Sequence, residues 1–129
     1  MSDIDALITE RLVPARKRVV DALIERHPHT YGFINRFLSG QENKLGIKVT
    51  DNEAVVGEYT FYLDGLYVKE VEKDRLDSEL HLPIGVIRPY GIIEKDVLEE
   101  IADDEGAFKQ DVLATARKYL PRVTIKFLR

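Results

Sequence analysis

The sequence has no cysteine, and this absence excludes three kinds of chemistry. The protein can form no disulfide, no thiolate metal site and no cysteine nucleophile. Serine is also scarce, since only Ser2, Ser39 and Ser78 occur, and each falls in an expected helix cap or loop. No Gly-x-Gly-x-x-Gly, phosphate-loop or Gly-x-Ser-x-Gly motif is present, and the lack of the last argues against a serine hydrolase.

The histidines do not form a recognisable metal-binding motif. His27 and His29 flank Pro28, a spacing that suits neither a coordination site nor a rigid helix face. His81 alternates with two leucines and is expected on the side of a strand away from them. The acidic run at 99–105 is interpreted as a solvated helix end, because it lacks the alternating ligands and central glycine of a calcium loop. We therefore expect no metal and no cofactor, and no pattern marks a catalytic residue.

Long apolar runs are missing as well. No stretch approaches the ~20 apolar residues that a bilayer-spanning helix needs, so integral membrane association is not expected. The first residues, Met-Ser-Asp-Ile-Asp-Ala, are acidic and lack the apolar core of a signal peptide, which predicts a cytoplasmic protein. The formal net charge of −4 argues against nucleic-acid binding. The one basic cluster, Arg16-Lys17-Arg18, is predicted to lie on the solvated side of an amphipathic helix.

What is present indicates one folded domain. A length of 129 residues with 44% hydrophobic residues suits a single domain, 1–129, with one core. Strands grouped between helices predict an α+β fold, in which an antiparallel sheet of about five strands has helices packed on one face. The expected elements are N-terminal helices over 3–38 interrupted at Pro14, a β-meander over 45–84, helices over 95–119 and a C-terminal strand over 123–128.

The strongest local signal is the dipeptide Asp64-Gly65 between β-branched and aromatic residues. Asp-Gly suits a two-residue type I′ turn, because glycine adopts positive φ without steric cost. A turn at these two residues would place Leu63 opposite Leu66. The face that carries Leu63 and Phe61 is then expected to meet the helices.

The segment 84–93 mixes Pro89 and two glycines with bulky apolar residues. We expect it to form neither a regular helix nor a central strand, but an irregular segment that covers the core or lines a cavity. It adds to a surplus of apolar side chains in the chain. The simplest explanation of this surplus is a dry, filled core. The alternative is a ligand cavity between the helices and the sheet. The candidate lining residues are Phe33, Phe37, Ile84, Ile87, Tyr90, Leu98, Ile101 and Phe108, with Arg88 or Tyr90 as the contact for a polar head group.

Four short stretches carry a family resemblance, namely Gly46-Ile-Lys-Val-Thr-Asp51, Glu58-Tyr-Thr-Phe-Tyr-Leu-Asp-Gly65, Val68-Lys-Glu-Val71 and Leu76-Asp77 leading into Leu80-His-Leu82. They resemble the sterol-carrier-protein family of small lipid-binding domains. In that family a helix precedes a meander with Asp-Gly-like turns, helices follow, and a strand ends the sheet. The sequence departs from the family's pattern at 84–93 and at 122–126. The resemblance implies a small non-catalytic lipid carrier.

Two functions of different classes follow from the apolar surplus. The first is a non-catalytic carrier or binding domain for a fatty acyl or other lipid-like molecule, which the family resemblance favours. The second is a protein-interaction module, such as a homodimer, that buries the surplus apolar surface without a small-molecule ligand. An enzyme ranks third, because no convergent set of polar residues is visible.

Overall fold

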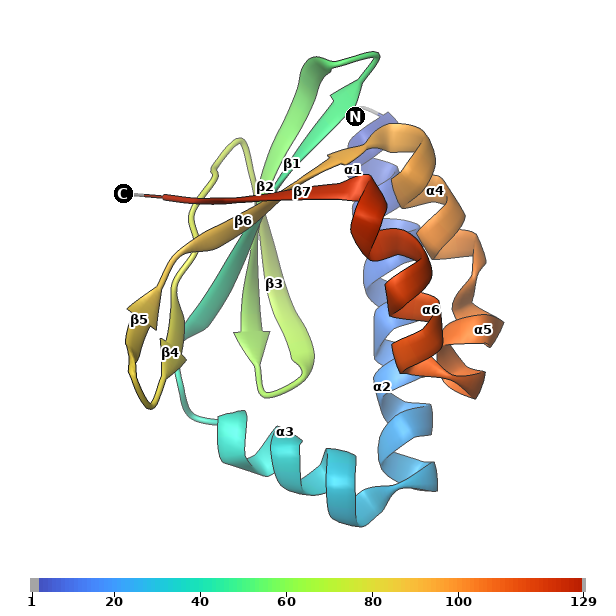
Figure 1. Ribbon diagram of the computed structural model, residues 1–129, viewed down its shortest axis with the longest axis vertical. Helices are drawn as coiled ribbons and strands as arrows, with labels where there is room; N and C mark the ends of the chain where they lie inside the picture. The colour runs from blue at the N-terminus through green and yellow to red at the C-terminus, as the bar shows by residue number, and fades with distance from the viewer. Residues whose placement is uncertain (1–2, 129) are drawn as a thin grey trace.

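A computed structural model describes residues 3–128 and shows a mixed β-sheet with helices on one side (Figure 1). The main sheet has the strand order β3–β2–β1–β6–β7, and β4 pairs with β5 in a separate two-stranded sheet. β1 and β6 run parallel, whereas the other neighbouring strands run antiparallel. The strands are β1 (Asn43–Asp51), β2 (Ala54–Asp64), β3 (Tyr67–Lys73), β4 (Leu80–Leu82), β5 (Gly85–Ile87), β6 (Pro89–Glu94) and β7 (Val123–Phe127).

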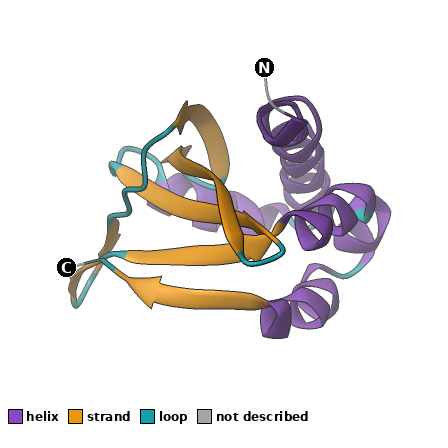
Figure 2. Ribbon diagram, turned by 90° about the horizontal axis from the view of Figure 1, so that it is seen from above, coloured by secondary structure: helices purple, strands orange, loops and turns teal. Residues whose placement is uncertain are grey.

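The helices come from both halves of the chain and gather on one side of the sheet (Figure 2). They are α1 (Asp3–Ala6), the π-helical turn η1 (Leu7–Leu12), α2 (Val13–Arg26), the π-helical turn η2 (Pro28–Gly32), α3 (Phe33–Leu38), α4 (Lys95–Asp103), α5 (Glu105–Gln110), α6 (Val112–Tyr119) and the 3-10 turn η3 (Leu120–Arg122). Within residues 3–128, no helix is both long enough and apolar enough to cross a bilayer.

The predicted α+β class is confirmed, but the prediction of a purely antiparallel sheet is wrong. β6 arises inside the segment 84–93, for which we expected no central strand, and it lies between β1 and β7. Pro89 occupies the first position of β6, where a missing N–H interrupts the ladder least, so the proline does not prevent the strand. The predicted fourth strand of the meander, β4, pairs with β5 outside the main sheet.

Pro14 changes the helix before it rather than ending it. Proline has no N–H to donate, and its ring crowds the carbonyl of the preceding turn. The chain accommodates this with the wide turn η1, after which the N–H of Val13 bonds to the carbonyl of Ile8, five residues back. The expected interruption at Pro14 is therefore a π-helical turn, and the helical path continues to Arg26.

The hydrophobic core lies between the helices and the face of the sheet that bears Val49, Tyr59 and Ile93, which we call the front face. These three side chains are at most 6% exposed. They pack against buried side chains of the helices, namely Ile4, Leu7, Ile8, Val97, Leu98 and Tyr119. Because side chains alternate along a strand, the opposite back face carries the polar residues of β1 and β2.

The β2–β3 hairpin turns one residue later than the sequence predicted. The turn residues are Gly65 and Leu66, so that Asp64 is opposite Tyr67 and Leu63 is not opposite Leu66. Gly65 has a φ of 61°, and the expectation that this glycine adopts positive φ is confirmed. The hairpin is thus present, but its register differs from the prediction.

The shifted register has a tertiary cause. The side-chain oxygen of Asn35 on α3 accepts a hydrogen bond from the Leu66 N–H at 2.8 Å. Arg16 on α2 donates to the Leu66 carbonyl oxygen at 3.2 Å. Two helices therefore hold the peptide groups of Leu66, and an irregularity between Tyr62 and Leu63 absorbs the extra residue.

We predict that Gly65→Ala destabilises the protein more than Gly40→Ala. Both glycines have positive φ, which costs alanine about 1–2 kcal/mol. A Cβ at Gly40 would meet nothing within 4 Å, whereas one at Gly65 would lie 2.7 Å from the carbonyl oxygen of Asn35 and closer still to its side-chain oxygen. Urea denaturation should show an additional loss of about 1–2 kcal/mol for Gly65→Ala. Equal losses in the two variants would contradict the docking of α3 on the hairpin.

An ion pair joins α2 to α5. Arg18 donates two hydrogen bonds of 2.8 Å to the two carboxylate oxygens of Glu105, and Lys109 lies 2.9 Å from the same group. These bonds, that from Arg18 above all, lower the pKa of the Glu105 carboxyl to about 2. A carboxyl whose pKa is lower in the folded state stabilises the fold at neutral pH, and this contribution disappears as the pH falls through the folded pKa.

We predict that Glu105→Gln lowers the free energy of unfolding at pH 7. The difference in this free energy between the variant and the unmodified protein should shrink as the pH falls from about 4.5 toward 2. Urea denaturation at a series of pH values measures this difference. Glu25→Gln is the control, because Glu25 is an exposed carboxylate of α2. A deficit for Glu105→Gln that stays constant with pH, or equals that of the control, would show that the ion pair does not stabilise the fold.

Candidate functional site

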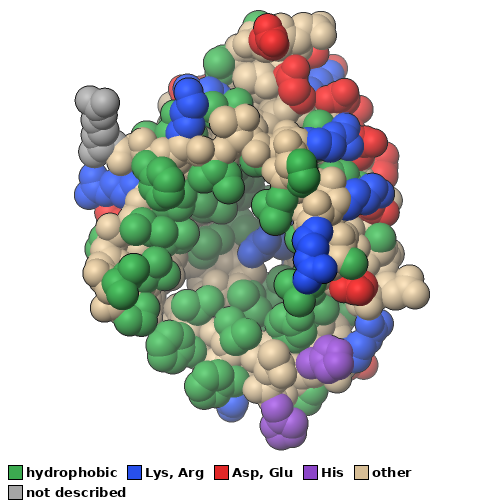
Figure 3. Space-filling view, viewed as in Figure 1, with side chains coloured by type: hydrophobic (Ala, Val, Ile, Leu, Met, Phe, Trp, Pro, Cys, Tyr) green, Lys and Arg blue, Asp and Glu red, His purple; other side chains and the backbone are tan. Residues whose placement is uncertain are grey.

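The helices that form the core cover only part of the front face. The remaining part bears Leu45, Leu63 and Pro89, which share the front face by alternation and are half-buried. α3 runs across this part of the molecule at a distance from the strands (Figure 1). Figure 3 shows a hollow between α3 and the sheet, with hydrophobic side chains gathered around it. We call this feature the hollow.

Eight apolar side chains on the elements around the hollow are between 41% and 64% exposed, namely Phe33, Phe37, Leu82, Val86, Leu113, Leu120, Ile125 and Phe127. Ile125 and Phe127 alternate with Val123, which packs on the core, so both point to the front face. Leu113 and Leu120 are seven residues apart and lie on one side of α6 and η3. Contiguous exposed apolar surface is typical of ligand and protein interaction sites.

α3 is held in place by few contacts. None of its side chains is buried. Its attachment to the hairpin is Asn35, and Phe33 and Phe37 lie two positions away on the opposite side of the helix, with their rings stacked 6.3 Å apart. Phe37 also lines a groove toward the β4–β5 hairpin, and Phe33 and Phe37 are 59% and 60% exposed.

A groove of about 610 Å³ continues from α3 to the β4–β5 hairpin. Its lining is mixed, and consists of Phe37, Gln41, Glu42, Glu79, His81, Leu82 and Pro83. His81 lies 3.1 Å from the carboxylate of Glu79 at this groove. No group of three or more histidine, aspartate or glutamate residues within 3–128 is placed to hold a metal ion.

Arg16 is exposed to solvent, but its side chain takes a different direction from those of its two neighbours. It was expected on the solvated side of its helix, together with Lys17 and Arg18. Those two side chains do point outward, toward Asp21 and Glu105 respectively. Arg16 instead crosses to Leu66 at the tip of the β2–β3 hairpin, and desolvation by the surrounding protein lowers the pKa of its guanidinium.

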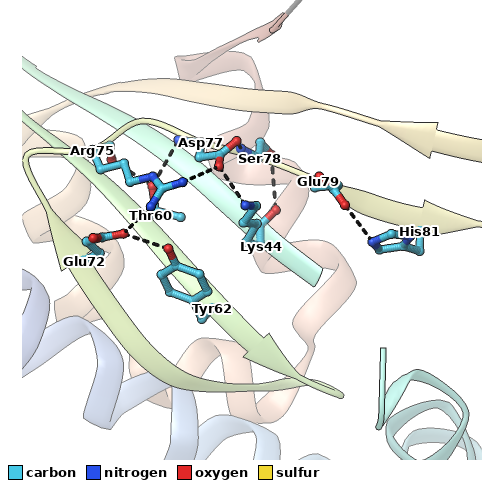
Figure 4. A network of polar contacts seen from close by, with 9 residues as sticks. All are labelled: Lys44, Thr60, Tyr62, Glu72, Arg75, Asp77, Ser78, Glu79 and His81. Atoms are coloured by element: carbon cyan, nitrogen blue, oxygen red, sulfur yellow. Dashed lines mark hydrogen bonds and ion pairs between the residues drawn. The ribbon is translucent and has the colours of Figure 1, made fainter. Parts of the chain in front are cut away.

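The back face carries a polar network that is closed on itself (Figure 4). Lys44 and Asp77 form an ion pair of 2.7 Å, and Arg75 lies 3.1 Å from the same carboxylate. The pKa of Asp77 is lowered, chiefly by the hydrogen bond from Lys44. Thr60, fully buried, donates to the Arg75 carbonyl at 2.8 Å and accepts from the Asp77 N–H at 3.0 Å. Because the charged and polar groups of this network bond to one another, we interpret the network as a set of contacts that holds the 74–79 segment against the back face.

The structure places the predicted residues of segment 84–93 in different surroundings. Ile84 is 91% exposed at the tip of the β4–β5 hairpin, and Ile87 pairs with Leu80 within it. Tyr90 lies beneath the Lys48 ammonium, 5.6 Å from the ring centre, and alternation puts it on the back face. Arg88 is exposed between β5 and β6.

Three other predicted lining residues belong to the core. Leu98 is 3% exposed, and Ile101 and Phe108 pack against the buried cluster. The ring of Phe108 is stacked on that of Tyr119 at 5.9 Å. Of the predicted lining, Phe33 and Phe37 are exposed on α3, the helix beside the hollow, while Leu98, Ile101 and Phe108 fill the space beneath the helices.

Some exposed apolar residues on the elements around the hollow were not recognised from the sequence. Ile125 and Phe127 were assigned only to a strand, and Leu113 and Leu120 were not singled out. Their exposure depends on which elements lie opposite them, and no local pattern carries that information.

No family model, curated protein or solved structure matches this chain.

We predict that Asn35→Ala loosens α3 without unfolding the sheet. The substitution removes the acceptor of the Leu66 N–H, which is half-buried at the hairpin. Hydrogen exchange should become faster in amides of α3 and stay unchanged in the β1–β2 ladder. Arg36→Ala is the control, because Arg36 is an exposed side chain on the same helix. Unchanged exchange in α3, or equal effects of the two variants, would show that Asn35 does not anchor this helix.

Proposed function

We propose that this protein binds a lipid-like ligand in the hollow and serves as a non-catalytic carrier. The observation that supports this proposal is the set of exposed apolar side chains around one hollow, contributed by α3, the β4–β5 hairpin, β7 and α6–η3 (Figure 3). An apolar chain in the hollow would displace water from these side chains. Each methylene removed from water contributes about 0.8 kcal/mol to binding.

Two further features support a carrier. α3 forms one side of the hollow and has no buried side chain, so it can move at low cost when a ligand enters or leaves. The order of elements, with helices before a meander and helices plus a strand after it, is that of the sterol-carrier-protein family, which the sequence resembles over 45–82. The polar network on the back face satisfies its own charges and does not resemble a catalytic site.

We predict saturable binding of a fluorescent long-chain fatty acid to delipidated protein. Phe37→Asp and Phe127→Asp should each weaken this binding roughly tenfold or more, because each replaces apolar surface at the hollow by a charge. The two residues lie on different elements, α3 and β7, so equal effects would assign them to one site. Titration followed by fluorescence provides the dissociation constants.

The matched control is Val55→Asp. Val55 is 55% exposed, which is close to the exposed fractions of Phe37 and Phe127. It lies at the start of β2, at the opposite end of the sheet from the hollow. Binding should be unaffected in this variant. Native mass spectrometry of the purified protein provides the oligomeric state in parallel. A dimer that dissociates in Phe37→Asp, together with no binding of fatty acid, would replace the carrier by the interaction module.

A further inference from the structure

We propose that the ligand of the hollow is an amphiphile with an anionic oxyacid head, a carboxylate or a phosphate, and that the guanidinium of Arg16 binds this head inside the hollow. The inference rests on the proposed function, because it names the class of ligand that the same site takes. It also moves the polar contact from Arg88, the residue expected from the sequence, to Arg16 on the apolar side of α2.

Arg16 interrupts the apolar side of α2. Leu12 lies four residues before it, Val20 four residues after it and Leu23 seven residues after it, so all four share one side of the helix. Leu12 packs against the core, and Val20 and Leu23 are 6% and 8% exposed. A charged residue in the middle of such a stripe is costly, because the charge loses part of its hydration. A position of this kind indicates a role beyond helix formation.

The structure shows no anionic partner for the cation of Arg16 among the residues it describes. Among residues 3–128, its side chain makes one hydrogen bond, to the carbonyl oxygen of Leu66 at 3.2 Å, and no ion pair. Its neighbours Lys17 and Arg18, in contrast, each have a carboxylate partner. A guanidinium offers five N–H donors, so most of the donors of Arg16 remain available to a ligand.

The surroundings of Arg16 match those of a site inside a concave surface. The residue is accessible to water, yet nearby protein atoms desolvate the guanidinium enough to lower its pKa. Figure 3 shows basic atoms within the hollow among the hydrophobic side chains. In such partly desolvated surroundings a charge-assisted, bidentate pair with a carboxylate or phosphate is stronger than at an open surface. The apolar rim would then hold the chain of the same ligand.

The competing explanation is that Arg16 only holds the hairpin through Leu66. Loss of one hydrogen bond to a carbonyl would then destabilise the protein, and ligand preference would not change. If Arg16 serves the ligand, removing its unpaired charge leaves the ligand-free protein as stable as before or more stable. Thermal unfolding of ligand-free Arg16→Met therefore separates the two explanations without any ligand.

The binding experiment compares three ligands with the same sixteen-carbon chain, namely hexadecanoate, hexadecyl phosphate and the uncharged hexadecanol. Each is measured by displacement of a fluorescent probe from delipidated protein. We expect at least one anion to bind about tenfold more tightly than the alcohol. Arg16→Met should abolish this advantage and leave hexadecanol binding unchanged, and Arg16→Lys should restore part of it. The preferred anion distinguishes a fatty acid from a phospholipid-like head.

The controls are Lys17→Met, which removes a neighbouring cation from α2, and Arg88→Met, which removes the cation predicted from the sequence. Both should keep the preference for the anion. Equal binding of anions and alcohol by the unmodified protein, or a preference that survives Arg16→Met, would overturn the inference while leaving the carrier function intact. Loss of the preference in Arg88→Met alone would assign the head group to that residue instead. If none of the three ligands binds, the proposed function fails and this inference fails with it.

Discussion

The parallel pairing of β1 with β6 is the constraint on which the rest of the structure depends. Parallel neighbours cannot be joined by a tight turn, so the chain between β3 and β6 must travel back along the sheet. Residues 74–79 make this passage across the back face. Gly46 permits it, because a Cβ there would lie 2.6 Å from the carbonyl oxygen of Asp77. Lys44, Thr60 and Asp77 then hold the passage with an ion pair and hydrogen bonds that leave few polar groups unsatisfied.

The same pairing decides how the front face is covered. The helices α4 to α6 connect β6 to β7, and together with α1 and η1 they pack over Val49, Tyr59 and Ile93. No helix of this layer reaches the other end of the sheet, where β7 ends and β1 begins. α3 crosses in front of that end, but it is attached at the hairpin through Asn35 and buries none of its own side chains. A hollow with an apolar rim results, and it is the basis of the proposed function.

The basic side chains of the helices differ in whether they have a carboxylate partner. Most basic side chains near the helices have carboxylate partners, as Arg18 has in Glu105 and Lys118 in Asp104. Exposed pairs of this kind contribute little to stability individually. Within residues 3–128, Arg16 has no carboxylate partner; it bonds to the carbonyl oxygen of Leu66 at the hairpin tip, and the surrounding protein desolvates its charge. This difference motivates an anionic ligand more directly than the apolar side chains do.

Several residues of the candidate site could have been predicted from the sequence. Helical period places Arg16 on the same side as Leu12, Val20 and Leu23, so its place on that side follows from spacing alone. The cluster Arg16-Lys17-Arg18 was interpreted as one solvated patch, although consecutive residues of a helix point about 100° apart. Phe33 and Phe37 were recognised because i and i+4 share a helix side, and the structure stacks their rings on α3. Leu98, Ile101 and Phe108 could not be separated from them, since apolar residues that fill a core and those that line a hollow are of the same types.

The sequence by itself determined the elements whose cause is local: the α+β class, the positive φ of Gly65, the interruption at Pro14 and the strand that follows the last helix. Only the tertiary structure decided which strands are neighbours. β6 became an interior strand because β1 and β7 satisfy the hydrogen bonds of its two edges, and no pattern within 84–93 encodes those partners. The turn at Gly65-Leu66 was likewise set by Asn35 and Arg16, which are distant in the chain. Turn and helix preferences depend on neighbours in sequence, whereas strand order, register and the hollow depend on contacts between residues far apart.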